Sequence, residues 1–343
     1  MKYSISKIEN VSFITINNDD GMMVVLSSFG ASIYDIEIKK KNQDYKSMVL
    51  TPKKLDDFYY NDAYYGKSIG RFSGRIDDGK CIIDNVTYNL EKNWNGINSL
   101  HGTSKGISFI NFDNKVIEDK DKIKVIFTCR EMENDLPGNM DYKITYTIAK
   151  DTKTINIHFE ATTDKKTLCN MTNHTYFNLS GNGKDTILDH RLYLNCDKYT
   201  KVNENLITTS IEKVDKIMDF RKAHKIKKYI FDKSLQDHIA KGYDHCFIKD
   251  NDDDDDVIAK LSYNKITLEV KTNYNNIVVY TCNYPKEFYF NIPKLKIVKH
   301  HAICLECQNI PNGINMDTTE KSLLDKNEKF DKYIEYNFII KGE

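Results

Sequence analysis

Short segments in which apolar and polar residues alternate recur along the whole chain. They are rich in β-branched and aromatic residues and are separated by clusters of Asn, Asp, Gly and Lys, which is typical of strands joined by turns. The clearest strand predictions are residues 11–16, 124–129, 154–159, 277–281 and 288–292. One segment, residues 231–240, has helical spacing, with apolar side chains at Phe231, Leu235 and Ile239.

The order of these segments predicts an all-β fold. No strand–helix–strand rhythm repeats, so a parallel α/β sheet is disfavoured. The 22 Tyr and 16 Phe suit sheets better than helices, and 15 Gly and 5 Pro form no obvious linker. We therefore expect residues 1–343 to form a single domain, a large antiparallel β-sandwich with few short helices.

Two charged runs are predicted to lie on the surface. The acidic run 252–256 lacks the spaced ligands, central Gly and terminal Glu of an EF-hand, so we interpret it as a solvated hairpin loop between two strands. The lysine-rich stretch 222–233 is interpreted as an exposed face.

The net charge, the apolar runs and the spacing of the cysteines limit the partners and the cellular location to be expected. Lys plus Arg number 50 and so do Asp plus Glu, which argues against nucleic acid as the main partner. The chain contains no apolar run of membrane-spanning length and no apolar stretch of a signal peptide at its N-terminus, so we expect a cytoplasmic protein. The eight scattered cysteines are expected to be reduced; Cys304 and Cys307, three apart in a strand, should point to opposite faces and share no metal.

Unusual residues mark three candidate parts of a site. Only five arginines occur, and Arg71 and Arg75 share the motif at 70–75; they are either surface ion-pair partners or a bidentate binding fork. Residues 170–179 combine amides, hydroxyls, aromatic rings and His174 without Lys or Glu, as a sugar pocket requires, although a lone histidine can also be structural. His101 lies in a short polar turn.

Two carboxylates complete the inventory. Asp244 lies between aromatic neighbours, and Glu306 lies within an apolar strand, where an ionised carboxylate without partners is costly. Such a carboxylate is either functional or part of a buried ion pair. Together these residue types suit proton transfer on a neutral polyol rather than phosphoryl transfer.

Seven motifs in succession carry a resemblance to a known family. They are Gly-Arg-Phe-Ser-Gly-Arg-Ile (70–76), Asn-Ser-Leu-His-Gly (98–102), Met-Thr-Asn-His-Thr-Tyr-Phe-Asn-Leu (171–179), Met-Asp-Phe-Arg (218–221), Gly-Tyr-Asp-His-Cys-Phe (242–247), Val-Tyr-Thr-Cys-Asn (279–283) and Cys-Leu-Glu-Cys-Gln-Asn (304–309). In this order, over nearly the whole chain, they resemble the aldose 1-epimerases, or galactose mutarotases. The resemblance implies a β-sandwich with an open cleft that interconverts the α and β anomers of aldohexoses without metal or organic cofactor.

The resemblance also implies a role for each candidate. His174 matches the proton donor to the ring oxygen, and Glu306 matches the acceptor of the proton from the anomeric hydroxyl. The remaining positions match substrate-binding residues: Arg75, His101, Asp244 and, in the pocket wall, Tyr176. Three departures from the family pattern, Gly74, Val278 and Cys282, leave the preferred hexose open.

Two alternatives remain beside this interpretation. A hexose-6-phosphate 1-epimerase would need a cationic phosphate clamp, and a non-catalytic sugar-binding or regulatory module would not need the His174–Glu306 pair. The expected partner is a small monosaccharide, and the protein is expected to be a monomer or homodimer. From reference pKa values of about 4.3 for Glu and about 6.5 for His, the base would be ionised and His174 mostly neutral near pH 7.

Overall fold

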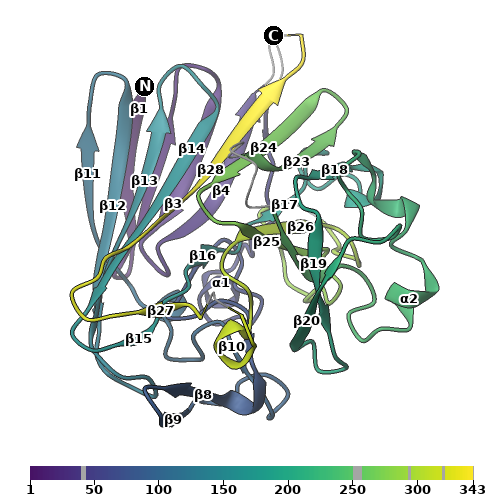
Figure 1. Ribbon diagram of the computed structural model, residues 1–343. Helices are drawn as coiled ribbons and strands as arrows, with labels where there is room; N and C mark the ends of the chain where they lie inside the picture. The colour runs from purple at the N-terminus through teal and green to yellow at the C-terminus, as the bar shows by residue number, and fades with distance from the viewer. Residues whose placement is uncertain (40–43, 250–256, 293–294, 319–320, 343) are drawn as a thin grey trace.

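The computed structural model describes residues 1–39, 44–249, 257–292, 295–318 and 321–342. Strands dominate these ranges, and every strand pair is antiparallel (Figure 1). Two short helices occur in the described ranges, α1 (Leu55–Tyr59) and α2 (Lys233–Gln236). No helix in this part of the chain is long and apolar enough to cross a membrane. The predicted all-β class is confirmed.

Three large sheets form the body of the fold. The nine-stranded sheet has the order β11 (Asp113–Glu118), β12 (Lys122–Glu131), β13 (Met140–Ala149), β14 (Thr154–Thr163), β28 (Phe330–Ile340), β24 (Ile266–Thr272), β23 (Val257–Tyr263), β18 (Arg191–Leu194) and β21 (His224–Lys225). The six-stranded sheet has the order β17 (Tyr176–Phe177), β26 (Ile303–Cys307), β25 (Asn276–Tyr280), β22 (Asp244–Ile248), β19 (Lys198–Val202) and β20 (Thr208–Lys213). The five-stranded sheet consists of β1 (Lys2–Ile8), β2 (Val11–Asn17), β3 (Met22–Ser27), β4 (Ser32–Lys39) and β5 (Tyr45–Ser47).

Four two-stranded ribbons complete the strands. They are β6 (Ser68–Ile69) with β16 (Thr172–Asn173), β7 (Arg75–Ile76) with β10 (Ser99–Leu100), β8 (Lys80–Ile83) with β9 (Val86–Asn89), and β15 (Thr167–Leu168) with β27 (Leu323–Leu324). Two of these ribbons matter for function. The ribbon of β6 and β16 directly precedes His174, and the ribbon of β7 and β10 contains Arg75 and directly precedes His101.

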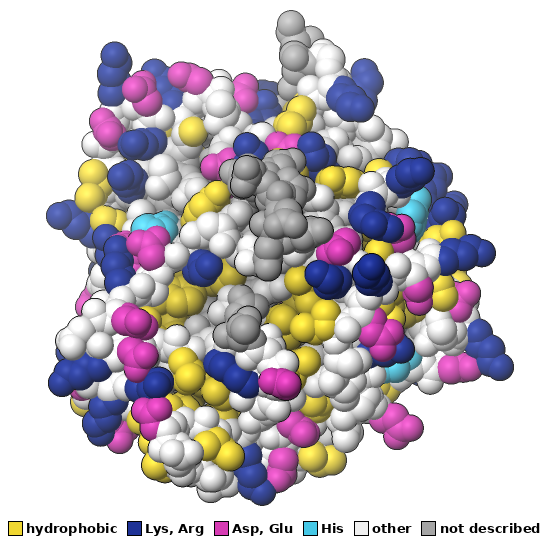
Figure 2. Space-filling view, viewed as in Figure 1, with side chains coloured by type: hydrophobic (Ala, Val, Ile, Leu, Met, Phe, Trp, Pro, Cys, Tyr) yellow, Lys and Arg dark blue, Asp and Glu magenta, His cyan; other side chains and the backbone are white. Residues whose placement is uncertain are grey.

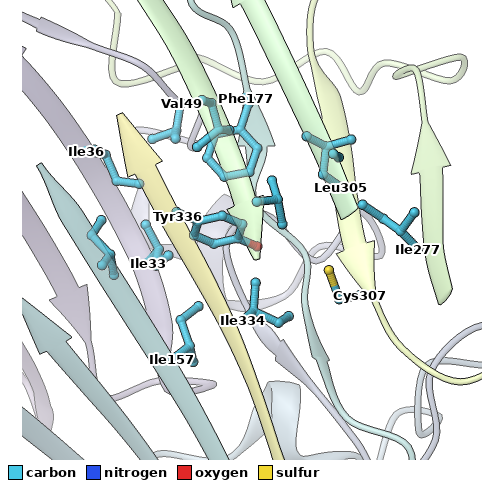
Figure 3. Packing of buried hydrophobic residues seen from close by; sticks show 14 of the residues in the cluster. Ile33, Ile36, Val49, Ile157, Phe177, Ile277, Leu305, Cys307, Ile334 and Tyr336 are labelled. Carbon is cyan, nitrogen blue, oxygen red and sulfur yellow. The ribbon is translucent and has the colours of Figure 1, made fainter. Parts of the chain in front are cut away.

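The core lies where the three large sheets meet. In β14 and β24 buried and partly exposed residues alternate, so each strand turns one apolar face inward, as the period of two requires. One apolar cluster contains side chains of all three sheets. In the view of Figure 3, Tyr336 of the nine-stranded sheet lies between Ile33 of the five-stranded sheet and Leu305 of the six-stranded sheet. This packing covers one face of the six-stranded sheet with apolar side chains.

Four of the five predicted strands are confirmed, as parts of β2, β12, β14 and β25. The fifth prediction, 288–292, is wrong: this segment makes one isolated bridge, between Phe290 and Pro52. Backbone hydrogen bonds flank the bridge, from Lys53 N–H to Tyr289 and from Asn291 N–H to Thr51. The N–H of Thr51 donates to the side-chain Oδ1 of Asn291 at 3.2 Å rather than to a backbone oxygen, which leaves the pairing as an isolated bridge.

The predicted helix is shorter than its pattern. Helix α2 makes one turn after Asp232, whose side chain accepts the N–H of Ser234 as an N-cap. Leu235 is buried, but Phe231 and Ile239 are 57% and 44% exposed, so the three apolar residues do not share a buried face.

The charged runs have different outcomes. The lysines of the 222–233 stretch are exposed, as predicted, while Ile226 and Ile230 between them are buried. The acidic run 252–256 lies outside the described residues. The expected hairpin is nevertheless wrong, because the flanking strands β22 and β23 belong to different sheets and do not pair with each other. On the face in Figure 2, Lys and Arg are interspersed with Asp and Glu.

Candidate active site

A pocket lies on the face of the six-stranded sheet that is turned away from the core. Its cavity volume is about 150 Å³. The structure brings all six predicted site residues to its lining: Arg75, His101, His174, Tyr176, Asp244 and Glu306. Residues that lie up to 231 positions apart in the chain are thus collected in one place.

Strand alternation in β26 places Glu306 in this pocket. Glu306 lines the pocket, while its neighbours Leu305 and Cys307 belong to the apolar core on the other face of the strand. Glu306 is only 2% exposed, and its Oε2 atom has no hydrogen-bond partner within the described part of the chain. A buried carboxylate oxygen without a partner is costly, which makes it a candidate to receive a proton from a ligand.

His174 follows β16 and faces Glu306. Backbone hydrogen bonds from His174 N–H to Lys67 and from Gly66 N–H to His174 fix its position. His174 Nε2 lies 3.6 Å from Glu306 Oε1, and the imidazole ring packs 5.1 Å from the ring of Tyr176. The acid and base candidates therefore point into the same small volume.

The aromatic wall behind His174 includes Tyr176. Its ring packs 4.2 Å from the ring of Tyr65, and its hydroxyl donates to the backbone oxygen of Ala63 at 2.9 Å. With this hydroxyl hydrogen already used, Tyr176 presents mainly its ring to the pocket. This agrees with the prediction that it forms part of the wall.

Arg75 and Asp244 lie together on another side of the pocket. Arg75 Nη2 is 3.3 Å from Asp244 Oδ2, and both side chains are at most 13% exposed. The guanidinium stacks over Trp94, with Cζ 4.5 Å from the ring. The pair places a planar fork of donors beside a carboxylate acceptor, an arrangement that suits sugar hydroxyls.

The other motif arginine has a different environment. Arg71 is 2% exposed, and its Nη2 lies 3.4 Å from Glu131 Oε1. Its Nη1 donates to the backbone oxygens of Leu136 and Pro137. Arg71 is thus a buried ion-pair partner outside the pocket, and only Arg75 of the motif contributes to the site.

His101 is positioned by the ribbon of β7 and β10. Its backbone N–H donates to Gly74, and the N–H of Gly74 donates to His101 Nδ1 at 3.2 Å. Gly74 has φ of 75°, and an added Cβ would come within 2.6 Å of the side chain of Pro311. The absence of a side chain at Gly74 therefore leaves room for Pro311 and permits the positive φ at which the Gly74 backbone bonds to His101.

Burial shifts the pKa values of the acid–base pair in opposite directions. It raises the pKa of Glu306 well above its usual range; nearby Asp244 adds to this shift and Arg75 opposes it. Burial lowers the pKa of His174 to about 4, against the effect of a hydrogen bond to its own backbone. Contrary to the expectation from reference pKa values, the uncharged form of Glu306 is favoured, because both groups lie in a poorly solvated pocket.

The donor chemistry of the site does not suit a metal ion. His101, His174 and Glu306 have potential ligand atoms within 4.8 Å of one another. However, His101 Nδ1 accepts an N–H, so the neutral ring carries its hydrogen on Nε2 and has no lone pair there for a metal. Metal-binding histidines instead donate their second nitrogen to an acceptor.

Sequence reasoning missed several lining residues. Trp94, the single tryptophan of the chain, is the clearest, and its uniqueness just before the motif at 98–102 was an available signal. Asp62 and Lys286 come from loops and carried no local signal. Of the three departures, Gly74 and Val278 line the pocket, with Val278 directly opposite Glu306 in the sheet, whereas Cys282 belongs to an apolar cluster behind it.

The fold and the pocket define an all-β protein with a carbohydrate-type site, in which polar side chains converge between aromatic rings. The sequence profile of the aldose 1-epimerase family matches residues 12–337. The chain is 30% identical to galactose mutarotase from Sus scrofa over 91% of this chain and 89% of that protein. It is 32% identical to aldose 1-epimerase from Haemophilus influenzae over 79% and 78%, respectively.

A solved structure supports the same assignment. Galactose 1-epimerase from Lactobacillus acidophilus superposes with a TM-score of 0.85 at 27% identity, covering 99% of both chains. The chain belongs to the aldose 1-epimerase family and is an isomerase.

Proposed function

We propose that the protein interconverts the α and β anomers of a neutral aldohexose, with galactose and glucose as the first candidates. One observation carries the proposal: His174 Nε2 and Glu306 Oε1 lie 3.6 Å apart at one pocket. The anomeric hydroxyl and the ring oxygen of a pyranose are bonded to the same carbon. Two groups this close can therefore reach both oxygens at once, which ring opening by acid and base requires.

The proposed cycle moves one proton at each residue. The Glu306 carboxylate takes the proton of the hydroxyl on carbon 1, while protonated His174 gives its Nε2 proton to the ring oxygen. The bond between carbon 1 and the ring oxygen breaks, and an aldehyde forms at carbon 1. After rotation about the bond between carbons 1 and 2, Glu306 returns its proton to the carbonyl oxygen and His174 takes the hydroxyl proton back. The ring then closes to the other anomer.

The pair holds the one proton that such a cycle requires. That proton lies either on His174 with Glu306 ionised or on Glu306 with His174 neutral. Because burial disfavours both charges, the second arrangement is favoured in the free protein. Ring opening starts from the first arrangement, so the proton passes from Glu306 to His174 before that step, and the full cycle needs no net proton exchange with solvent.

The remaining residues are proposed to hold the sugar. Arg75 and Asp244 supply a donor fork and an acceptor for hydroxyls, His101 supplies an N–H, and the ring of Tyr176 covers an apolar face of the sugar. Buried polar atoms without partners in the described residues include Arg75 Nε and Trp94 Nε1, which are further candidate donors.

Charge pairing favours a neutral sugar over a sugar phosphate. The charged lining residues are two cations and three carboxylates. Arg75 is paired with Asp244 at 3.3 Å, and Lys286 Nζ is paired with Asp62 Oδ2 at 2.9 Å. Each of these cations is already neutralised, so the described residues of the lining form no cationic clamp to bind a phosphate. A purely sugar-binding role does not require the acid and base candidates His174 and Glu306 to face each other at 3.6 Å.

Polarimetry tests the proposal directly. Freshly dissolved α-galactose should reach its equilibrium rotation faster with the protein than without it, and His174→Asn should remove most of the acceleration. Glucose and a hexose 6-phosphate assayed in parallel define the substrate class. Absence of acceleration with every neutral aldohexose would refute the proposed function, and a clear preference for the phosphate would refute its substrate class.

Three further features of the chain are also proposed. The shared core of the three large sheets supports one domain over residues 1–343, and the monomer-or-homodimer expectation stands as a proposal for sedimentation analysis. A cytoplasmic location is supported by the eight cysteines, all of which are free. Cell fractionation tests the location.

A further inference from the structure

The two pocket histidines have different partners behind them. An amide N–H only donates, so the bond from Gly74 N–H to His101 Nδ1 at 3.2 Å leaves the hydrogen of neutral His101 on Nε2. Burial lowers the pKa of His101 well below its usual range, which keeps the ring neutral. His101 therefore faces the pocket with a fixed N–H donor.

The two ring nitrogens of His174 face different partners. Nδ1 lies 3.5 Å from Cys304 Sγ, a contact in which either atom can be the donor. Nε2 lies 3.6 Å from Glu306 Oε1, and burial favours the uncharged Glu306 carboxyl, which has a hydrogen to give. Nε2 is therefore the acceptor toward Glu306, and the hydrogen of neutral His174 lies on Nδ1, where the sulfur can accept it. His174 then has the opposite tautomer from His101.

Strand pairing holds Cys304 at this place. Cys304 is completely buried in β26 and pairs directly with Tyr176 of β17. Tyr176 follows His174 by two residues, so this pairing brings Cys304 close to His174. Its side chain lies on the same face of the strand as Glu306. The sulfur therefore contacts the acid candidate from the strand that also carries the base candidate.

We propose that Cys304 is a positioning residue whose sulfur accepts the Nδ1–H of His174 and thereby reserves Nε2 for proton exchange with the sugar. The inference rests on the proposed function, in which Nε2 gives a proton during ring opening and takes one back during closure. A neutral ring can take that proton only when its own hydrogen is on Nδ1.

An uncharged partner suits this task. Burial raises the pKa of the Cys304 thiol well above its usual range, so the group stays neutral. A carboxylate in its place would stabilise the imidazolium and make His174 a weaker acid. The sulfur orients the ring without holding the proton that the ring must release.

Nitrogen NMR of the full chain labelled with ¹⁵N-histidine reads the tautomers near pH 7.5, and the variants His174→Asn and His101→Asn identify the two signals. We expect the hydrogen of His174 on Nδ1 and that of His101 on Nε2. Cys304→Ala removes the sulfur, Cys304→Ser keeps an acceptor, and Cys307→Ala is the matched control. Cys307 is also completely buried in β26 but faces the core.

The expected effect follows from losing one hydrogen bond to the acid. Cys304→Ala should lower kcat about 3- to 10-fold with KM within about twofold, and its His174 signal should shift toward a mixture of tautomers. Cys304→Ser should keep the parental tautomer and most of kcat. Cys307→Ala should lose thermal stability but retain kcat and tautomer.

Two results would overturn the inference: a parental His174 with its hydrogen on Nε2, or a Cys304→Ala variant with parental kcat and tautomer. The first needs no Cys304 variant, so the inference stays testable even where Cys304→Ala fails to fold. A parental protein without mutarotation activity refutes the proposed function instead, and the NMR result distinguishes the two failures.

Discussion

Replacing Glu306 by Gln should abolish activity and stabilise the fold at the same time. The amide keeps the shape of the side chain but cannot take a proton from the anomeric hydroxyl. General base catalysis typically contributes about 10²- to 10⁴-fold, or roughly 3 to 5 kcal/mol of transition-state stabilisation. We therefore expect kcat/KM to fall at least about 100-fold.

The stability gain follows from the buried carboxylate. Glu306 is 2% exposed, and burial raises its pKa well above the usual range. Above the usual pKa the unfolded chain has lost this proton, whereas the native protein keeps it up to the raised pKa. The native state then binds more protons, so the free energy of unfolding falls as pH rises through this window. Each pKa unit of the shift corresponds to about 1.4 kcal/mol.

Glu306→Gln removes this pH dependence. The melting temperature of the variant should exceed that of the parental protein, and the difference should be larger at pH 8 than at pH 5. Thermal unfolding followed by circular dichroism measures the difference, and polarimetry on the same samples measures turnover. His174→Asn is the control, because it removes the acid while retaining the Glu306 carboxylate.

Two outcomes contradict this reasoning in different ways. A folded Glu306→Gln variant with near-parental turnover removes Glu306 from the mechanism. A variant that is less stable than the parental protein at pH 8 shows instead that Glu306 is a stabilising ion-pair partner. The structure argues against that role, since Glu306 Oε2 has no partner in the described residues.

Further predictions concern the binding residues, a buried lysine and metal dependence. Arg75→Lys should lower kcat/KM for galactose at least about 10-fold, because it loses the fork; an unchanged value removes Arg75 from the site. The emission of Trp94, the single tryptophan, should change on galactose titration, and a flat titration contradicts its placement at the sugar. Burial lowers the pKa of Lys67 to about 7, so its contribution to the free energy of unfolding should rise from pH 7 toward 10. Lys67→Met should accordingly raise the melting temperature most at pH 7 and below and progressively less toward pH 10, whereas a pH-independent gain contradicts this reasoning. Chelation and dialysis should leave mutarotation unchanged; activity that disappears and returns with a divalent ion refutes this expectation.

Local patterns were sufficient for the fold class and for much of the site. Alternation predicts which face of a strand is buried, so an acidic residue at Glu306 among apolar neighbours could be recognised without a structure. The prediction at 288–292 had the same alternation and was wrong. Its partner segment makes one isolated bridge, in which Thr51 N–H donates to the side chain of Asn291, and this contact can be known only once the two segments are known to meet.

The chemistry of the site depends on pairings that no local pattern contains. His174 meets Glu306 because β17 pairs with β26, which brings residues about 130 positions apart into register. The same pairing buries both groups, so the uncharged form of Glu306 is favoured, contrary to its reference pKa value, whereas His174 stays neutral as expected. Residue types therefore predicted which groups could exchange protons, whereas the sheet order determines where each proton resides. A variant that keeps the motifs but loosens the pairing of β17 with β26 should retain the residues of the site and lose its acid–base pair.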